Sequence, residues 1–440
     1  MSHPSSEPET ARVVYGIEDA PPLLERIPLG IQHLVAMLLG NITPPLLIAG
    51  GLSLAVGETA FLLQMALVMA GVATLVQSYG VGPVGGRLPI VMGTTIAFVG
   101  AAVATGKQFG LGAVFGACLV ASVVEIALGL SIGKLRRLFP PLVNGVVVML
   151  IGLTLIPVGM DYAAGGPGAA DYGALSNLSI AGLVFLVTLV LNQFTRGFLA
   201  YGSMLVGVTV GYLAAIAAGK VDFSAVGEAG WFALPRLLSY PLEFHAVPIL
   251  LMAMVYVITT METLGDISGT TAAVGRKPTD RELRGGLLAD GVMSGLAALI
   301  SAFPNTSYSQ NVGLVHFTGV VSRHVTGVVG VLLMLLGLVP KVGALFATIP
   351  PSVIGGGGLI MFAMIFSSGF SIVHRDVELD RRSMVILAVS IGLGLGCELR
   401  KDALQHLPEV AQSLFSSGLV TGGLAALALN LVLPTDRQDT

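Results

Sequence analysis

Long apolar runs recur along this chain from residue 29 to residue 433. Most approach the roughly 20 residues that an α-helix needs to cross a bilayer. Charged residues make up only 11% of the 440 residues, against roughly 25% in a typical soluble domain. The mean hydropathy of +0.87 agrees with this pattern. We therefore predict an all-α polytopic membrane protein, because helices satisfy their own backbone hydrogen bonds in lipid.

Fourteen candidate spans follow one another, and several are shorter than a full helical crossing. They cover residues 29–50, 59–78, 88–104, 111–130, 141–157, 179–195, 200–219, 246–265, 286–302, 305–318, 325–339, 345–366, 383–397 and 413–433. The third and the tenth also carry too many polar residues for an ordinary span. The segment 220–245 between spans 7 and 8 is predicted to be an interfacial helix or a loop.

The distribution of basic residues predicts the orientation in the membrane. Residues 1–28 lack the apolar core of a signal peptide and are expected to form a cytosolic tail, as are residues 434–440. With the N-terminus inside, the cytoplasmic segments hold 16 of the 22 Lys and Arg residues and the other side holds 6. This asymmetry predicts an even number of spans with both termini cytoplasmic. The membrane is expected to be the inner (plasma) membrane of the cell.

Matching features in the two halves of the chain indicate an internal repeat. IPLGIQHLVAM opens the first half and AVPILLMAMVY opens the second, with Pro28 and Pro248 lying 220 residues apart. GRLPIVMGTTIAF and SAFPNTSYSQNVG place a proline and small polar residues at the third span of each half, and Thr94 and Gln310 are 216 apart. Seven spans per half is an odd number, so the halves are expected to form inverted repeats, an architecture of secondary transporters.

The two polar spans are expected to be broken. Proline removes a backbone donor and disrupts a helix, and irregular backbone at membrane depth survives only inside protein or beside a cavity. We expect spans 3 and 10 to begin as short extended stretches and to finish as half-helices. The N-termini of the half-helices would carry partial positive charge and free N–H groups toward the middle of the bilayer. The polar residues of these spans are therefore predicted to line a pocket.

Several ionisable and amide side chains lie near this predicted pocket. Glu262 and Asp266 share one helix face in METLGDISGTT, and Asp290 lies near the start of span 9. Gln32 and His33 lie one turn into span 1. A carboxylate at the bilayer centre costs roughly 2.5–3.5 kcal/mol on insertion scales, which makes Glu262 a candidate functional residue.

Glu262 and Gln310 together suit a flat polar solute. A carboxylate only accepts hydrogen bonds, whereas a glutamine side chain both donates and accepts, so the pair matches a ring that presents N–H donors beside a carbonyl. A nucleobase has such an edge. Further amide, hydroxyl and aromatic side chains are also predicted to contact the solute, and the aromatic rings could stack on a base. They are Asn311, Thr94, Thr95, Phe98 and Tyr308.

At this point the residues resemble a known family. QNVGLVHFTG at 310–319 is similar to the signature of the nucleobase–ascorbate transporters (nucleobase:cation symporter-2): Gln or Glu, Asn, any residue, Gly, four residues, Thr, then Arg, Lys or Gly. QHLVAM, GRLPIVMGTT, ETLGD and FPNT fit the same family, and the resemblance covers nearly all of 28–430. Asp266, Gln310 and TGVVSR resemble the bacterial xanthine/uric acid branch. His316 departs from the expected Gln, which leaves the particular purine open.

The resemblance implies a fold and a mechanism. It implies a core domain, 29–130 (spans 1–4) and 246–339 (spans 8–11), and a gate domain, 141–219 (spans 5–7) and 345–433 (spans 12–14). It further implies a homodimer in membrane lipid, elevator-type alternating access and purine import by proton symport, with no cofactor, although carboxylates serve sodium as well. Glu262 and Gln310 would hold the base, and Asp290 would support the site or the proton coupling. Asp266, His33 and Gln32 are grouped with Asp290 in this supporting role.

Structural roles compete with these assignments. Glu262 could be an ion-pair partner within a helix bundle, and Asp290 could form a salt bridge with the basic loop that precedes it. Asn311 could fix backbone instead of touching the solute, and His33 could be a buried structural histidine. Glu125, deep in span 4, could belong to a proton path or be a protonated carboxyl bonded to a neighbouring span.

Other classes of function fit the sequence less well. An anion exchanger of the same architecture would use a cation and avoid a carboxylate in its pocket, and a uracil permease would carry other residues at 266 and 310. An intramembrane enzyme needs a nucleophile or a metal constellation. The two cysteines and seven scattered histidines give neither, and no metal site is predicted. The net charge of −3 and the lack of a basic arm argue against nucleic-acid binding, and the glycine runs lack a phosphate-loop pattern.

Overall fold

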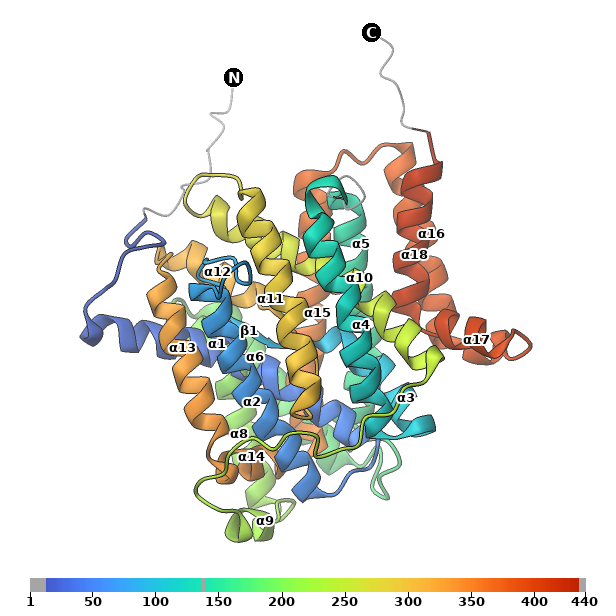
Figure 1. Ribbon diagram of the computed structural model, residues 1–440. Coiled ribbons are helices and arrows are strands. Elements are labelled where there is room, and N and C mark those ends of the chain that lie inside the picture. The colour runs from blue at the N-terminus through green and yellow to red at the C-terminus, as the bar shows by residue number, and fades with distance from the viewer. Residues whose placement is uncertain (1–12, 136–139, 435–440) are drawn as a thin grey trace, which may run out of the picture.

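The computed structural model describes residues 13–135 and 140–434 as a bundle of helices with a two-stranded sheet at its centre (Figure 1). The elements of the first half are α1 (Leu23–Gly51), α2 (Val56–Tyr79), β1 (Met92–Thr94), the 3-10 turn η1 (Ile96–Phe98), α3 (Val99–Phe109), α4 (Leu111–Leu135), α5 (Pro141–Ala163), α6 (Leu175–Phe194), α7 (Phe198–Tyr201), α8 (Ser203–Ala217) and α9 (Ser224–Glu228).

The second half repeats this order of long and broken elements. It consists of α10 (Ala246–Ala272), α11 (Asp280–Leu299), β2 (Asn305–Ser307), α12 (Ser309–Thr318), α13 (Arg323–Gly337), α14 (Pro340–Ala347), α15 (Pro351–Asp376), α16 (Arg381–Leu399), the 3-10 turn η3 (Lys401–Leu404), α17 (Glu409–Phe415) and α18 (Gly418–Val432).

Each of the fourteen predicted spans corresponds to an element of the described chain, and the helical membrane fold is confirmed. Eight described helices are long and apolar enough to cross a membrane, and α13 with α14, bent by 82° at their junction, makes a ninth. The remaining five predicted spans are the helix α11, whose first turns are charged, the shorter helices α8 and α18, and the two broken segments that contain β1 and β2. The short lengths seen in the sequence therefore reflect real interruptions of the helices.

Some boundaries differ from those predicted. The twelfth predicted span, 345–366, begins inside α14, whereas the long helix α15 begins at Pro351 and ends at Asp376. Proline fits the first turn of a helix, where its missing N–H has no helical partner, so Pro351 starts a new helix. The start of predicted span 14 at 413 falls in the separate helix α17. The segment 220–245 contains the short helix α9 and otherwise forms a loop without regular secondary structure.

The two broken spans meet as an antiparallel strand pair, as the extended stretches in spans 3 and 10 predicted. β1 and β2 pair in the register Met92↔Ser307, Gly93↔Thr306 and Thr94↔Asn305. Backbone bonds beyond the strands, from Thr95 N to Pro304 O (2.9 Å) and from Tyr308 N to Val91 O (3.0 Å), extend the pairing. These bonds satisfy backbone groups that would otherwise be unpaired at membrane depth.

The helices pack in two groups. The first group is α1–α4 with α10–α14, in which α2 packs on α13 and α4 packs on α11; the second group is α5–α8 with α15–α18, in which α5 packs on α15. Contacts between the groups are sparser. Small residues allow the close approaches, since a Cβ at Gly355 or Gly356 would overlap the backbone of α5 or α6. The GGGG run at 355–358 therefore serves close helix packing.

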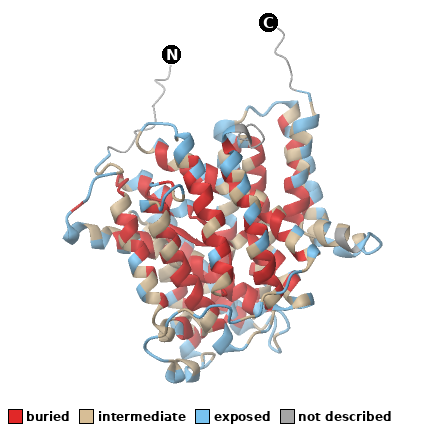
Figure 2. Ribbon diagram, in the orientation of Figure 1, coloured by how far each residue is buried: buried red, intermediate tan, exposed pale blue. Residues whose placement is uncertain are grey.

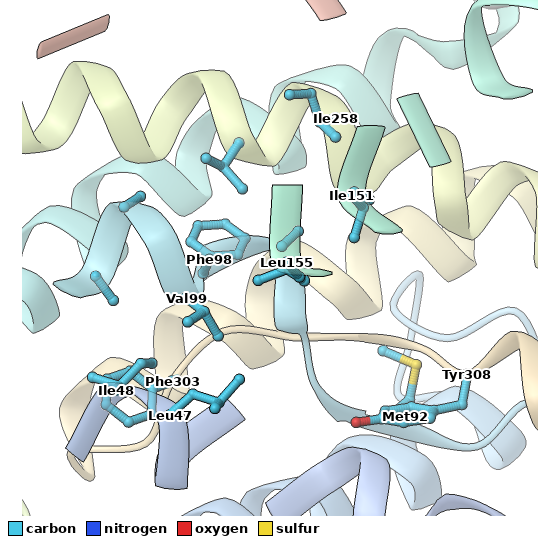
Figure 3. Close-up of a cluster of buried hydrophobic side chains, with 14 of the residues drawn as sticks. Leu47, Ile48, Met92, Phe98, Val99, Ile151, Leu155, Ile258, Phe303 and Tyr308 are labelled. Carbon is cyan, nitrogen blue, oxygen red and sulfur yellow. The ribbon is translucent and has the colours of Figure 1, made fainter. Parts of the chain in front are cut away.

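Buried residues fill the interior of the helix bundle, whereas the ends and the outer faces are more exposed (Figure 2). Figure 3 shows part of this core, with Phe98, Leu155 and Ile151 on one side and Met92 and Tyr308 near the strands. Only 28% of the most apolar stretch of α6 and 22% of that of α16 are buried, so much of these two helices faces outward. The strand pair is therefore held at the centre of the molecule, and the outer helices surround it.

Candidate functional site

A cavity of about 440 Å³ lies between the two helix groups at the strand pair. This volume falls in the range of roughly 300–1,000 Å³ that is common for small-molecule sites. The first group contributes Ala36, Gly40, Thr94, Thr95, Ile96, Glu262, Thr306, Ser307, Tyr308, Ser309, Gln310 and Gly313. The second group contributes Val148, Thr188, Asn192, Ala200, Tyr201, Ser203, Met204, Ile360, Met361, Met364, Ile365 and Ser368.

Glu262 and Gln310 both line this cavity, as a shared solute site requires. Glu262 projects from α10 and is half-buried, while Gln310 is in the first turn of α12 and is exposed to the cavity. The side chains of the described residues form no hydrogen bond or salt bridge with either group, so both remain free for a ligand. An ion-pair role for Glu262 therefore has no support in the described chain.

The start of α12 opens onto the same cavity. Tyr308 is the residue before the helix and supplies no side-chain cap, and both Ser309 and Gln310 of the first turn line the cavity. The first N–H groups of a helix have no partner within the helix and carry partial positive charge. On the other broken span, Ile96 at the start of η1 also lines the cavity. Both half-helices thus begin at the site, as the sequence predicted.

Tyr308 forms one wall of the cavity in a fixed orientation. Its hydroxyl donates to Thr94 O at 2.8 Å. Its ring is flanked by Gly40 and Gly93, where an added Cβ would lie 2.6 Å and 2.5 Å from ring carbons. Phe98 is placed differently: it is buried outside the cavity lining and packs edge-on against Tyr256, with ring centroids 4.7 Å apart.

Thr94 and Thr95 bring hydroxyl groups to the site from the end of β1. Thr94 Oγ1 is buried and has no hydrogen-bond partner among the described residues, although its side chain lines the cavity. Thr94 N donates to Asn41 Oδ1 at 2.7 Å, which holds the strand end in place. Thr95 Oγ1 accepts from Ala97 N at 3.3 Å and caps the turn that follows.

Asp266 supports the site from behind the cavity lining. It accepts hydrogen bonds at 2.6 Å from Ser307 Oγ and, through its other oxygen, from Ser309 Oγ. One carboxyl therefore ties α10 to the end of β2 and to the first residue of α12. The spacing of Glu262 and Asp266, four residues apart, places one carboxyl in the cavity and the other under its floor.

His33 and Asn311 bond to each other at a distance from the cavity. Asn311 Nδ2 lies 3.0 Å from His33 Nδ1 and donates to His33 O at 3.0 Å. Both side chains are buried, and neither lines the cavity. They join α1 to the first turn of α12, which supports the structural roles considered for both. Gln32 is half-buried beside them on α1 and is also outside the cavity lining.

Asp290 and Glu125 are fully buried and lie outside the cavity lining. Asp290 accepts a hydrogen bond from Thr263, and Glu125 accepts one from Thr259 at 3.4 Å. Arg276 of the basic loop before α11 pairs with Glu282, and no described Lys, Arg or His forms a salt bridge with Asp290. His316 lies at the far end of α12, where its Nε2 is 2.8 Å from Gly269 O.

Sequence reasoning missed the second helix group's share of the cavity. Thr188 and Asn192 on α6, Tyr201 on α7 and Ser368 on α15 add polar groups opposite Glu262. Thr188, Asn192 and Ser368 lie in long apolar helices without a break, and Tyr201 lies in a short helix just before α8, so no local pattern marked them. A polar residue near a span end, such as Asn192, is the signal that could have been followed.

Comparison with known proteins agrees with this geometry. Residues 24–402 match the Permease family, Xan_ur_permease. The chain is 37% identical over 406 residues to the xanthine permease of Bacillus subtilis, covering 92% of each chain. It is 36% identical over 419 residues to the uric acid permease PucK of the same organism, covering 95% of this chain and 97% of the relative.

A solved structure shows the same fold in a more distant protein. The transmembrane domain of a cyanobacterial bicarbonate transporter, BicA, superposes with a TM-score of 0.59 at 14% identity. The superposition covers 94% of this chain and 98% of that one. At this level of identity the likeness concerns the fold alone.

Proposed function

The chain belongs to the Permease family of nucleobase:cation symporter-2 proteins, and from this premise we propose that it carries a purine nucleobase, xanthine or uric acid, across the plasma membrane. It is a multi-pass membrane protein, and its relatives are named permeases and transporters, so it is a transporter and not an enzyme. The observation that carries the proposal is that Glu262 and Gln310, unpaired within the described chain, line one cavity.

The chemistry of the cavity suits a flat, polar ring. Glu262 accepts from ring N–H groups, Gln310 donates to a carbonyl and accepts from an adjacent N–H, and the open start of α12 offers further donors. The fixed ring of Tyr308 provides an aromatic surface beside these groups. Xanthine and uric acid present alternating N–H and carbonyl groups along the ring edge. The N–H groups can donate to Glu262, and the carbonyl groups can accept from Gln310 and from the start of α12.

Two alternatives are disfavoured by the same residues. A carrier of sulfate or bicarbonate shares the fold, but a free carboxylate in the cavity repels an anion, and Glu262 has no cation beside it among the described residues. A uracil permease would belong to the same family. The residues Asp266 and Gln310, together with the xanthine and uric acid permeases among the relatives, favour the purine.

We propose that transport uses proton symport and an elevator movement of the first helix group against the second, which correspond to the core and gate domains. The position of the cavity between two separately packed groups supports the movement, since sliding one group would carry the solute-binding residues with it. The inverted repeat is supported by matched packing: α2 packs on α13 as α11 packs on α4, and α6 packs on α8 as α16 packs on α18.

The same proposal includes a homodimer with both termini in the cytoplasm. The outward-facing helices α6 and α16 leave large apolar side chains exposed, including Phe185, Leu186 and Leu393. Lipid and a second copy of the chain are the occupants that such a surface suits. Native mass spectrometry in mild detergent distinguishes a dimer from a monomer.

Uptake of radiolabelled xanthine and uric acid by proteoliposomes tests the function. Wild-type protein is expected to show saturable uptake, and Glu262→Gln is expected to abolish it, because a donor would replace an acceptor that the ring N–H needs. Sites built on such hydrogen bonds discriminate by roughly 10⁴ in favourable cases. Glu228→Gln, an exposed carboxyl on α9, is the matched control and should transport normally.

The outcome for Glu262→Gln decides the assigned role, and near-normal uptake would refute it. Gln310→Asn should change the ratio of xanthine to uric acid uptake more than it changes expression, since it retracts the amide by one methylene. Competition by uracil, or saturable sulfate uptake that survives Glu262→Gln, would favour one of the alternatives instead.

A further inference from the structure

Glu125 is a buried carboxyl that the solute site does not use. It lies in the middle of α4, its side chain is fully buried, and it does not line the cavity. One carboxyl oxygen, Oε1, accepts from Thr259 Oγ1 at 3.4 Å. The other, Oε2, has no hydrogen-bond partner among the described residues. Such an atom needs a partner, because buried polar groups are almost always hydrogen-bonded.

Asp290 shows the same pattern on the facing helix α11. Its Oδ2 accepts from Thr263 Oγ1, while its Oδ1 is buried and unpartnered within the described chain. Thr259 and Thr263 are four residues apart on α10 and so share one helix face. Two hydroxyls on one face of α10 therefore each hold one oxygen of a separate carboxyl and leave the second oxygen free.

The two carboxyls are brought together by the close packing of α4 on α11. An added Cβ at Gly291, next to Asp290, would lie 2.9 Å from the backbone N of Ile126 and 3.2 Å from Ser122 O. Ile126 follows Glu125 directly, so the backbones touch where the two carboxyl residues occur. Without a Cβ at residue 291, α11 lies close to α4 at the level of the two carboxyls, and both carboxyls are buried within electrostatic range of each other.

The described ionisable side chains near this pair are mainly other carboxyl groups, and none is a Lys, Arg or His that pairs with either carboxyl. The ionisable groups within electrostatic range of Glu125 are Asp290 on α11 and Glu262 on α10, and Asp266 lies within range of Asp290. Tyr256 of α10 is within range of both carboxyls, but its hydroxyl donates to Cys118 O at 3.2 Å. No group of α3, the third element packed on α4, acts on Glu125. The salt bridges of the described chain leave both carboxyls without a Lys, Arg or His partner. Two ionised carboxylates buried together without a cation are strongly unfavourable, so at least one of the two must be protonated or neutralised by another bound cation.

We propose that Glu125 and Asp290 share one proton and form the coupling-ion site of this carrier, separate from the solute carboxylate Glu262. The proton resides on one carboxyl as an O–H and donates to the free oxygen of the other. This inference rests on the proposed transport function. A proton needs only two oxygen atoms, whereas Ca²⁺ and Mg²⁺ take six or more oxygen ligands. The two unpartnered oxygens match the smaller requirement.

A hydrogen-bonded path joins this pair to the solute cavity. Thr263 Oγ1, which bonds Asp290, lies 3.2 Å from Thr306 Oγ1 and 3.4 Å from Ser307 Oγ. Thr306 and Ser307 both line the cavity, and Ser307 bonds Asp266. Hydroxyls both donate and accept hydrogen bonds, so a change in the protonation of the buried carboxyl pair alters the hydrogen bonds of the strand that lines the solute site. Proton binding and solute binding are coupled through these residues.

Proteoliposomes that carry the Glu125→Gln variant test the proposal. Gln keeps the shape and its amide donates to Asp290, so the site is filled without an exchangeable proton. Solute counterflow, which needs no net driving force, should stay within about twofold of wild type. Accumulation of xanthine against its gradient, driven by an alkaline interior, should fall to equilibration with the outside. Glu228→Gln is the matched control and should keep both activities.

Two transport results would overturn the proposal. One is that Glu125→Gln accumulates xanthine under a pH gradient to the same level as the wild-type protein. The other is that the wild-type protein accumulates xanthine in response to a sodium gradient and not in response to a pH gradient, since the site would then hold sodium. If Glu125→Gln fails to fold, Thr259→Val takes its place: it removes the hydroxyl from Glu125 at nearly constant volume and should shift the pH at which accumulation is half-maximal. An unchanged pH profile would equally overturn the proposal.

A measurement without solute separates this proposal from the proposed function. Infrared difference spectra of the purified wild type between acid and alkaline buffer should contain a protonated-carboxyl band that is absent from Glu125→Gln and present in Glu228→Gln. If the wild type carries neither purine, the proposed function fails while the loss of this band still supports a proton on the pair. Identical spectra for wild type and Glu125→Gln would exclude the shared proton.

Discussion

Thr74 and Ser294, which lie 220 positions apart in the sequence, perform the same task on the two central strands. Thr74 Oγ1 accepts from Met92 N at 2.9 Å and donates to Met92 O at 3.2 Å. Ser294 Oγ accepts from Asn305 N at 3.0 Å and donates to Asn305 O at 3.1 Å. In each case one hydroxyl on a long helix satisfies both backbone groups of a strand residue that has no helix to supply them. The spacing equals that of Pro28 and Pro248, which supports the proposed repeat.

Removing either hydroxyl should loosen the strand pair. Thr74→Val and Ser294→Ala each leave a buried N–H and a buried C=O unpaired, which we expect to lower the free energy of unfolding by about 1–3 kcal/mol. Thermal unfolding in detergent and purine uptake should both decline. Ser390→Ala is the matched control, because Ser390 is equally buried on α16 and its hydroxyl has no partner in the described chain. Equal melting temperatures for Ser294→Ala and Ser390→Ala would contradict the bracing role.

The ring of Tyr308 should be sensitive to any side chain at Gly93. A Cβ there would lie 2.5 Å from Tyr308 Cε2 and 2.9 Å from Asn41 Oδ1, so the ring must move away from Thr94 O. We expect Gly93→Ala to raise the KM for the purine about tenfold, which corresponds to about 1.4 kcal/mol. Gly100→Ala on α3, where an added Cβ meets nothing within 4 Å, should leave KM unchanged. A wild-type KM for Gly93→Ala would show that the ring position does not matter for binding.

The sequence predicted the broken spans because proline and small polar residues are legible signals at membrane depth. Pro304, followed by NTSYSQN, marks backbone that must leave a helix, and the strand pair and the start of α12 follow from it. Glu262 and Gln310 were found for the same reason, since isolated polar groups in apolar spans are costly. Their meeting in one cavity was an inference from the two breaks.

The direction of individual side chains and the residues on the opposite wall of the cavity could not be predicted from the sequence. Phe98 and Asn311 share short segments with residues that line the cavity, yet both turn into the interior, because a single residue step changes the face of a helix or turn. Thr188 and Asn192 come from an uninterrupted span of the second group. Which outer helix faces the site depends on packing between distant segments, which one sequence does not specify locally.

Asp380 should stabilise α16 in a pH-dependent way. Its Oδ1 accepts from Ser383 N at 2.6 Å, and this backbone bond, with the Ser383 hydroxyl, holds the pKa of Asp380 below its usual range. Because the folded pKa is the lower one, the stabilisation is present above the unfolded pKa of about 3.9 and is lost as pH falls through the folded pKa. The melting temperature should therefore differ between wild type and Asp380→Ala at pH 7 and converge toward pH 3.

The matched control for this titration is Glu378→Ala, an exposed neighbour in the same loop. We expect its melting temperature to follow wild type across the range. A difference between wild type and Asp380→Ala that stays constant from pH 7 to pH 3 would mean that the cap does not act through the ionised carboxylate.

A disulfide between the two helix groups should arrest the proposed movement. An added Cβ at Gly202, before α8, would lie 3.2 Å from Val35 Cγ1 on α1, and a cysteine at residue 35 places its sulfur near that methyl position. A disulfide needs Cβ atoms about 3.5–4.5 Å apart, and a sulfur position about one van der Waals contact from the other Cβ is compatible with that span. In a background with Cys118→Ala and Cys397→Ala, oxidised Val35→Cys/Gly202→Cys should lose purine uptake, and a reductant should restore it. Each single cysteine variant should keep its uptake under oxidation, because neither can join the groups. Full uptake by completely cross-linked protein would mean that transport proceeds without relative displacement of the two groups at this contact.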